Sequence, residues 1–202
     1  MSIFKDNNTD SNNGAVKYLA GAGLVILEFV KIAILAGITI ALVRYYLFKP
    51  FYVKGASMEP NFFDHEYLII DELTYRFNEP NRGDVIVFKY PDNPKEYFLK
   101  RIIGLPGERV KITGGQVLIY NEGHPEGLSI KEGYLPKNIY TDGERTITLG
   151  QDQFFVLGDN RPNSYDSRRF GAVDRNLIVG RAWFRGWPIS RIQLFATPEF
   201  QL

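Results

Sequence analysis

The sequence predicts an all-β, barrel-like domain of antiparallel sheets that follows one N-terminal transmembrane helix. Before residue 50, apolar residues form one long run, which suits a membrane-spanning helix. After residue 50, apolar residues alternate with polar ones or form short runs, and Gly, Pro, Asn and Asp separate these runs. No long stretch in this second part has helical periodicity, so strands are expected throughout it.

The overall composition is that of a globular protein and excludes several kinds of site. Of the 202 residues, 45% are hydrophobic and 23% are charged. The net charge of +1 gives no electrostatic reason to expect a nucleic-acid partner. Because the chain has no cysteine and only two histidines, it cannot form disulfides, thiol-based sites or a histidine-rich metal site. We therefore expect no metal ion and no other cofactor.

The N-terminal part divides into a polar tail and an apolar segment. Residues 1–17 are rich in Asn, Asp and Ser, so we expect them to be disordered. Residues 18–48 are mostly apolar, and 29–48 are long enough, at about 1.5 Å per residue, to cross a hydrocarbon core of roughly 30 Å. The part before it, 18–28, either extends this helix or lies at the membrane interface. Basic residues lie on both sides of the segment, so charge alone does not orient it.

Residues 50–202 are expected to form the β domain, and short apolar or alternating runs predict its strands. The expected strands are Tyr67–Ile70, Val85–Phe88, Tyr97–Ile103, Val117–Tyr120, Thr146–Leu149, Phe154–Leu157 and Leu177–Phe184. Turn-forming pairs such as Pro106-Gly107 and Asp142-Gly143 separate them. Residues 110–151 are expected to form a small β extension of the domain.

Two residues in this domain have surroundings that suit catalysis. Ser57 follows the small residues Gly55 and Ala56, which let another chain approach it closely, although an ordinary turn has the same pattern. Lys100 lies in the apolar run Tyr97–Ile103, where burial would lower its pKa and leave a neutral amine able to accept a serine proton. The alternative is a lysine that extends from a strand edge into solvent.

A polar loop, Gly158–Arg168, directly follows the predicted strand Phe154–Leu157. Loops at strand ends are common positions for functional residues. The alternative is a turn held by internal hydrogen bonds and by an ion pair of Arg168 with Asp166 or Asp159. Such a turn would also be compatible with a functional site, because it would shape the surroundings of the residues near it.

Four segments carry motifs in an order that resembles bacterial type I signal peptidases, the membrane-bound Ser/Lys peptidases of family S26. Ser57–Pro60 matches the family's nucleophile motif, and Lys100–Glu108 matches its lysine motif. Gly158–Arg168 matches its Gly-Asp-Asn motif, and Arg82–Phe88 matches a structural motif. The resemblance covers roughly residues 44–190.

For catalysis, the resemblance implies a serine endopeptidase that removes N-terminal signal peptides from exported preproteins. Ser57 would attack the scissile carbonyl, and Lys100 would be the general base and then the acid for the leaving amine. Ser164 would bond and orient the lysine, and Gly158 would leave room beside it. The remaining structural residues implied for the site are Asp159 and an ion pair of Asp166 with Arg168.

The resemblance also implies how the substrate is bound. The family binds the cleavage region as an extended strand with small residues at positions −1 and −3 before the cut, whose side chains point the same way. The residues that would line the two pockets are Phe51, Val53, Phe98 and Leu99. Some family members have a serine two residues before the nucleophile that donates to the oxyanion. Here that residue is Gly55, so the second oxyanion donor is open.

The expected partners are signal peptides of preproteins that emerge from the translocase, and the lipid bilayer. The family places the catalytic domain on the extracytoplasmic side of the plasma membrane, and a thylakoid membrane is the alternative. The aromatic segment Trp183–Pro188 either packs in the core or faces the membrane.

Two other functions are alternatives to a Ser/Lys peptidase. A Ser-His-Asp hydrolase would need His65 or His124 as its base, and neither lies in a segment that resembles a catalytic motif. A catalytically inactive, membrane-tethered binding module is the alternative from a different class. Against it, Ser57 and Lys100 are both present, each within its complete motif.

Overall fold

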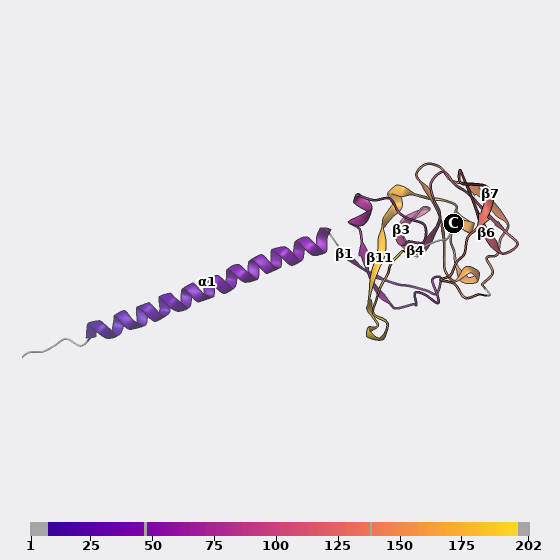
Figure 1. The fold of residues 1–202 in the computed structure, drawn as a ribbon. Coiled ribbons are helices and arrows are strands. Elements are labelled where there is room, and N and C mark those ends of the chain that lie inside the picture. Colours follow the sequence, from indigo (N-terminus) through magenta and orange to yellow (C-terminus); the bar gives the residue numbers. More distant parts are fainter. Residues whose placement is uncertain (1–7, 47, 138, 198–202) are drawn as a thin grey trace, which may run out of the picture. The chain divides into compact units, whose positions relative to one another are not determined.

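The computed structural model describes residues 8–46, 48–137 and 139–197. The chain forms two compact units, Met1–Tyr45 and Tyr46–Leu202. The first unit contains the long helix α1, and the second contains all the strands (Figure 1). The prediction of an antiparallel all-β domain after one apolar helix is confirmed.

Helix α1 spans Asn8–Tyr46 and differs from the expectation at both ends. It begins inside the tail predicted to be disordered, because a helix that has nucleated extends into neighbouring residues at low cost. It ends before residue 48, since the first proline of the chain, Pro50, disfavours helical backbone at the residue before it. Phe48 therefore begins a strand instead of ending the membrane helix.

Within α1, Gly23–Ala41 is long and apolar enough to cross a membrane, which fits a single-pass anchor. This candidate span begins earlier than the predicted 29–48, so the upstream apolar stretch extends the helix. Glu28 and Lys31 consequently lie inside the span. Residues three apart on a helix share a face, so these opposite charges can pair and lower the cost of their burial in lipid.

The first sheet has the strand order β1-β2-β11-β3-β4-β9-β10, and β12 pairs with β11. Every pairing in it is antiparallel. Its strands are β1 (Phe48–Tyr52), β2 (Tyr67–Asp71), β3 (Val85–Tyr90), β4 (Asn93–Gly104), β9 (Gln153–Leu157), β10 (Val173–Asp174), β11 (Ile178–Trp187) and β12 (Gln193–Leu194).

The second sheet has the order β7-β6-β5-β8 and lies in the region where we expected a small β extension. Its strands are β5 (Arg109–Thr113), β6 (Gln116–Asn121), β7 (His124–Ser129) and β8 (Arg145–Thr148). The described helices besides α1 are short: η1 (Thr74–Arg76), η2 (Arg161–Asn163), α2 (Ser167–Phe170), η3 (Arg175–Leu177) and η4 (Ile189–Arg191).

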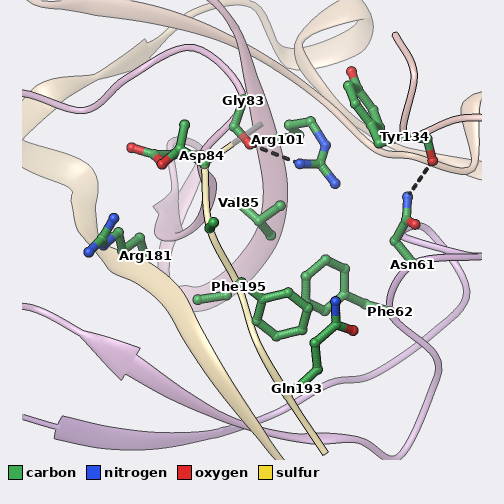
Figure 2. A pocket seen from close by; sticks show the side chains of 13 residues that line it. Asn61, Phe62, Gly83, Asp84, Val85, Arg101, Tyr134, Arg181, Gln193 and Phe195 are labelled. Atoms are coloured by element: carbon green, nitrogen blue, oxygen red, sulfur yellow. Dashed lines mark hydrogen bonds between the residues drawn. The ribbon is translucent and has the colours of Figure 1, made fainter. Parts of the chain in front are cut away.

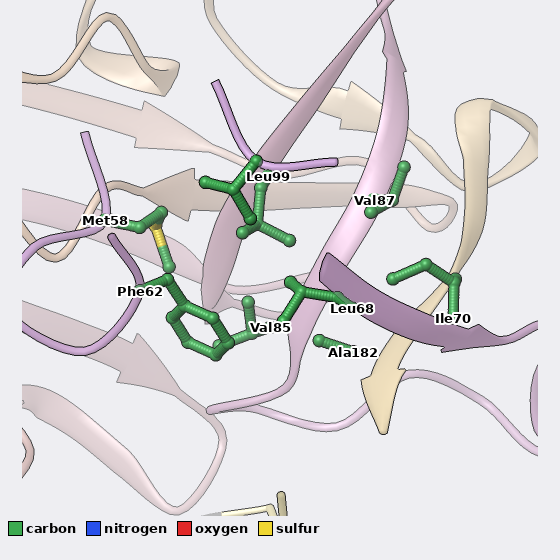
Figure 3. Close-up of a cluster of buried hydrophobic side chains, with 9 residues drawn as sticks. Met58, Phe62, Leu68, Ile70, Val85, Val87, Leu99 and Ala182 are labelled. Atoms are coloured by element: carbon green, nitrogen blue, oxygen red, sulfur yellow. The ribbon is translucent and has the colours of Figure 1, made fainter. Parts of the chain in front are cut away.

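The first sheet does not close into the barrel-like form that we expected, because in the described residues β1 pairs only with β2. Phe51 of β1 packs against a buried apolar cluster to which β2, β3, β4 and β11 contribute (Figure 3). Met58 and Phe62 from the turn after β1 complete this cluster, and each is 1% exposed. Burial of one such side chain is worth roughly 1.5–3 kcal/mol, so the cluster fixes the turn that contains Ser57.

Candidate active site

The turn between β1 and β2 contains Ser57 and, directly after it, the buried residue Met58. Met58 is packed in the apolar cluster of Figure 3. Gly55 has a φ of +85°, a conformation that glycine adopts without strain, and its N–H donates to Asp64 Oδ1 over 2.9 Å. The Gly55 N–H is therefore already bonded, whereas within the described residues the Ser57 N–H has no hydrogen-bond partner.

Asn160, a residue that we did not single out from the sequence, connects this turn to the Gly-Asp-Asn loop. Its backbone N–H donates to the carbonyl oxygen of Ser57 over 3.0 Å. Its side-chain amide donates to the carbonyl oxygen of Ala56, also over 3.0 Å. Two hydrogen bonds from one residue thus fix the backbone on both sides of the Ser57 peptide nitrogen. The motif match contained Asn160, but a sequence pattern does not show which backbone group an amide will reach.

Strand β4 brings Lys100 to Ser57 although the two residues are 43 positions apart. Lys100 pairs with Ile86 of β3 in the middle of the sheet, and the residue is 4% exposed. Its Nζ donates to Ser57 Oγ over 2.7 Å and to the carbonyl oxygen of Leu99 over 3.0 Å. The predicted nucleophile and the predicted base are therefore in direct contact.

Burial lowers the pKa of the Lys100 ammonium from its ordinary value to about 8, and the carboxylates of Asp166 and Asp159 partly oppose this shift. The apolar surroundings include the Phe98 ring, whose centroid lies 5.4 Å from Nζ. A lysine with a pKa near 8 has a substantial neutral fraction around neutral pH. Such an amine can accept a proton, which an ordinary solvated lysine rarely does.

The neighbour of Lys100 in sequence, Arg101, is equally buried but has fixed partners. Its guanidinium donates to both carboxylate oxygens of Asp159 over 2.8 and 2.7 Å, and to the carbonyl oxygen of Gly83 over 2.8 Å. Its guanidinium carbon lies 3.9 Å from the centroid of the Tyr134 ring. The loop residue Asp159 thus balances the charge of Arg101 and lets strand β4 carry two buried cations.

Figure 2 shows a small cavity of about 160 Å³ that Arg101 helps to line. Arg101 contacts Gly83 on one side of it, and the Asn61 amide donates to the carbonyl oxygen of Tyr134 on the other. The Asn61 amide also donates to Asp159 Oδ2 over 2.8 Å. Arg101 and Tyr134 thus line the cavity, whereas neither Ser57 nor Lys100 lines it.

The Gly158–Arg168 loop is held by a second ion pair and by the second sheet. Arg168 donates to both carboxylate oxygens of Asp166 over 2.8 Å each. Asp166 also accepts the Gly158 N–H over 3.1 Å. Arg161, which is 1% exposed, joins the Gly158 carbonyl oxygen to Glu132, a residue that follows β7. Residues of the second sheet region therefore help to position the loop beside Ser57.

Within the described residues no hydrogen bond joins Ser164 to Lys100, the bond that the resemblance implied, and this role of Ser164 stays a prediction. Its Oγ is buried and has no hydrogen-bond partner among the residues that the structure describes. It lies against Gly158, where an added Cβ would be 2.1 Å from Ser164 Oγ and 2.4 Å from the Ser57 carbonyl oxygen. Gly158 therefore makes room for Ser164 and for the backbone of Ser57, and not only for the lysine.

A cleft of about 550 Å³ passes the Ser57–Lys100 contact. The four residues expected to line substrate pockets all border it, Phe51 and Val53 from the β1 side, and Phe98 and Leu99 from β4. In the described residues, β1 pairs only with β2, and the part of β4 before Arg101 pairs only with β3. Each wall of the cleft thus includes a strand with an unpaired edge, to which an extended peptide can add.

Comparisons with known proteins identify the family. The family model described as signal peptidase, peptidase S26, matches residues 26–187. A signal peptidase I of Leptolyngbya laminosa is 38% identical over 86% of this chain and 85% of its own length. A probable signal peptidase I-2 of Synechocystis is 37% identical over 83% of this chain and 76% of its own length.

A solved structure gives a related match. The signal peptidase I of Enterococcus faecalis V583 is 34% identical and covers 52% of this chain and 97% of the solved chain, with a TM-score of 0.43. The family match, by contrast, includes all four motif segments and the end of the apolar helix. The chain therefore belongs to the signal peptidase family, peptidase S26, and is a serine peptidase.

Proposed function

We propose that this signal peptidase cleaves preproteins with a Ser57–Lys100 dyad, after small residues at positions −1 and −3. The observation that carries the proposal is the 2.7 Å contact between Lys100 Nζ and Ser57 Oγ. It joins a hydroxyl at the cleft to a buried amine with a lowered pKa. General-base catalysis needs a base within about 2.6–3.2 Å of the proton that it removes.

In the proposed reaction, neutral Lys100 takes the Ser57 hydroxyl proton as Oγ bonds to the scissile carbonyl carbon. The Lys100 ammonium then gives this proton to the leaving amine as the C–N bond breaks, which leaves an ester on Ser57. Water attacks the ester, Lys100 takes the water proton, and the proton returns to Ser57 Oγ. The free N–H of Ser57 is the proposed oxyanion donor, because Gly55 N–H is bonded to Asp64.

The proposed preference for small side chains follows from the walls of the cleft beside Ser57. Val53 and Leu99, one from each wall, are 3% and 6% exposed, so the surface that they form is closely packed and cannot recede to admit a large side chain. On an extended peptide, side chains at −1 and −3 point to the same side, so both meet this filled surface. Ser164 remains the proposed lysine-orienting residue, as a buried hydroxyl without a partner in the described residues.

Cleavage is expected to depend on pH through Lys100. Protonated Lys100 cannot accept the Ser57 proton, so kcat/KM of a signal peptide substrate should rise about tenfold per pH unit below the pKa of about 8 and level off above it. The measurement is a pH–rate profile of the detergent-solubilised chain, with circular dichroism at each pH to show that the fold is kept. A flat or falling profile in this range would contradict a lysine base.

The substrates that we propose are preproteins at a membrane, where the chain is anchored once through α1. A plasma membrane is the proposed location, with the catalytic domain on the extracytoplasmic side. The cyanobacterial relatives fit a thylakoid membrane as the alternative. Substrates that emerge from a translocase would reach the domain while still attached to the same bilayer.

We also propose that the domain touches the bilayer through Trp187, which is 52% exposed. Ile189, Ile192 and Leu194, which follow it, are all more than half exposed. A Trp183→Phe variant keeps Trp187 as the sole tryptophan, and its fluorescence should be quenched strongly by brominated phospholipids in proteoliposomes. The matched Trp187→Phe variant, which keeps half-buried Trp183, should be quenched less. Equal quenching would contradict this contact.

A further inference from the structure

A second pocket continues the substrate cleft away from Ser57. It has a volume of about 460 Å³ and shares two lining residues, Phe51 and Tyr97, with the cleft. Its other lining residues come from β1, from β2 and Glu72 directly after it, from β3, and from η3 and β11. The shared residues show that the two spaces are neighbours along the same pair of walls. One extended ligand could therefore occupy both.

The alternation of side chains along β1 sets the distance between the successive parts of this groove. Lys49, Phe51 and Val53 are two residues apart, so their side chains project to the same side of the chain, about 6.6 Å apart. Val53 borders only the cleft beside Ser57, Phe51 borders both spaces, and Lys49 borders only the second pocket. An extended peptide along this wall has the same spacing. If the positions −1 and −3 lie at Val53 and Phe51, the position −5 lies at the second pocket.

The chemistry of the pocket selects for one kind of side chain. Its lining includes Ile70, Val87 and Ile178, which are buried, and Val179, which is half-buried. Two cations border it, but they differ. Lys49 forms an ion pair of 3.0 Å with Glu72, whereas exposed Lys89 forms no ion pair within the described residues. Because Glu72 also lines the pocket, the Lys49 charge is balanced there, and the pocket combines an apolar surface with one unpaired positive charge, that of Lys89.

We propose that this pocket is a subsite for the side chain at position −5 of the substrate, and that it prefers a large apolar side chain to a basic one. This proposal rests on the Ser57–Lys100 function proposed above, because that function places the scissile bond at Ser57 and position −1 beside Val53. Burial of a leucine against Ile70, Val87 and Ile178 removes apolar area from water. A lysine at −5 would lose this burial and meet the charge of Lys89.

The test uses the full chain in detergent and fluorogenic peptides that have alanine at −1 and −3 and leucine, alanine or lysine at −5. Wild type should cleave the leucine peptide with a kcat/KM about tenfold above that of the lysine peptide. Lys89→Glu should reduce this ratio to about threefold or less, because it reverses the charge at the border. The matched reversal Lys131→Glu, at an exposed lysine outside the groove, should leave the ratio unchanged.

A second variant tests the apolar part of the pocket. Val179→Phe adds volume where the leucine would lie, so it should remove the advantage of the leucine peptide over the alanine peptide. A circular dichroism spectrum and a melting temperature equal to those of wild type would show that the variant is folded. A wild-type ratio near one, or a ratio that Lys89→Glu leaves unchanged, would overturn the subsite while cleavage itself continued. Full cleavage by Ser57→Ala would instead overturn the proposed dyad.

Discussion

Replacing Lys100 with alanine is expected to lower the kcat of preprotein cleavage by at least about 10⁴-fold, and Ser57→Ala should have an effect of similar size. The two groups are in contact over 2.7 Å and act as one unit, so the loss of either removes the covalent step. The double variant should therefore be no worse than either single one. The measurement is single-turnover cleavage of a preprotein by the detergent-solubilised chain.

Lys100→Arg separates the role of a base from that of a fixed charge. Arginine keeps the positive charge and much of the length, but it does not release its proton in proteins, so this variant should be as inactive as Lys100→Ala. Lys137→Ala, at an exposed lysine, is the matched control and should retain wild-type activity. Substantial activity in Lys100→Arg would show that the buried cation acts electrostatically and that another group is the base.

Much of the fold could be predicted because its strands have simple patterns. Every strand expected from alternating or short apolar runs has a counterpart in the structure. The strands that were not predicted are β1, β5, β7, β10 and β12. Four of them have weak patterns, since β1 and β7 contain a proline and β10 and β12 have two residues each, whereas β5 alternates clearly and was missed. The open sheet was not predicted either. Whether β1 closes onto β4 depends on pairing between distant segments, which local patterns do not determine.

The candidate site also has a part that could be predicted from local sequence and a part that could not. Ser57 and Lys100 could be identified because their motifs are local in sequence, and the structure places them in contact. The contacts of Asn160 and the ion pair of Arg101 with Asp159 depend on segments about 60 to 100 residues apart. The sequence did indicate that ion pair. Arg101 lies in the same apolar run as Lys100, and a second buried cation there needs a buried carboxylate as its partner.

The second large effect is expected for Gly158→Ala, which adds a single carbon beside the dyad. The new Cβ would lie 2.4 Å from the Ser57 carbonyl oxygen and 2.1 Å from Ser164 Oγ. Ser164 is a short side chain and could rotate, but the Ser57 carbonyl belongs to a turn held by Asn160 and by Met58 packing. The backbone of Ser57 must therefore shift by a sizeable fraction of an ångström, and misplacement on this scale costs about 10²-fold in rate.

The measurement is kcat and KM for one signal peptide substrate in wild type and Gly158→Ala, with the melting temperature as a check of the fold. The loss should appear in kcat, because the added carbon meets the backbone of Ser57, whereas the four expected pocket residues belong to the β1 side and to β4. Gly123→Ala is the matched control. Its Cβ would meet only the Asn121 side chain, at 3.5 Å, an ordinary contact distance, so its kcat should equal that of wild type. Unchanged kcat in Gly158→Ala would mean that the Ser57 turn can move without losing its alignment with Lys100. The glycine would then serve the packing of the loop instead of the position of the nucleophile.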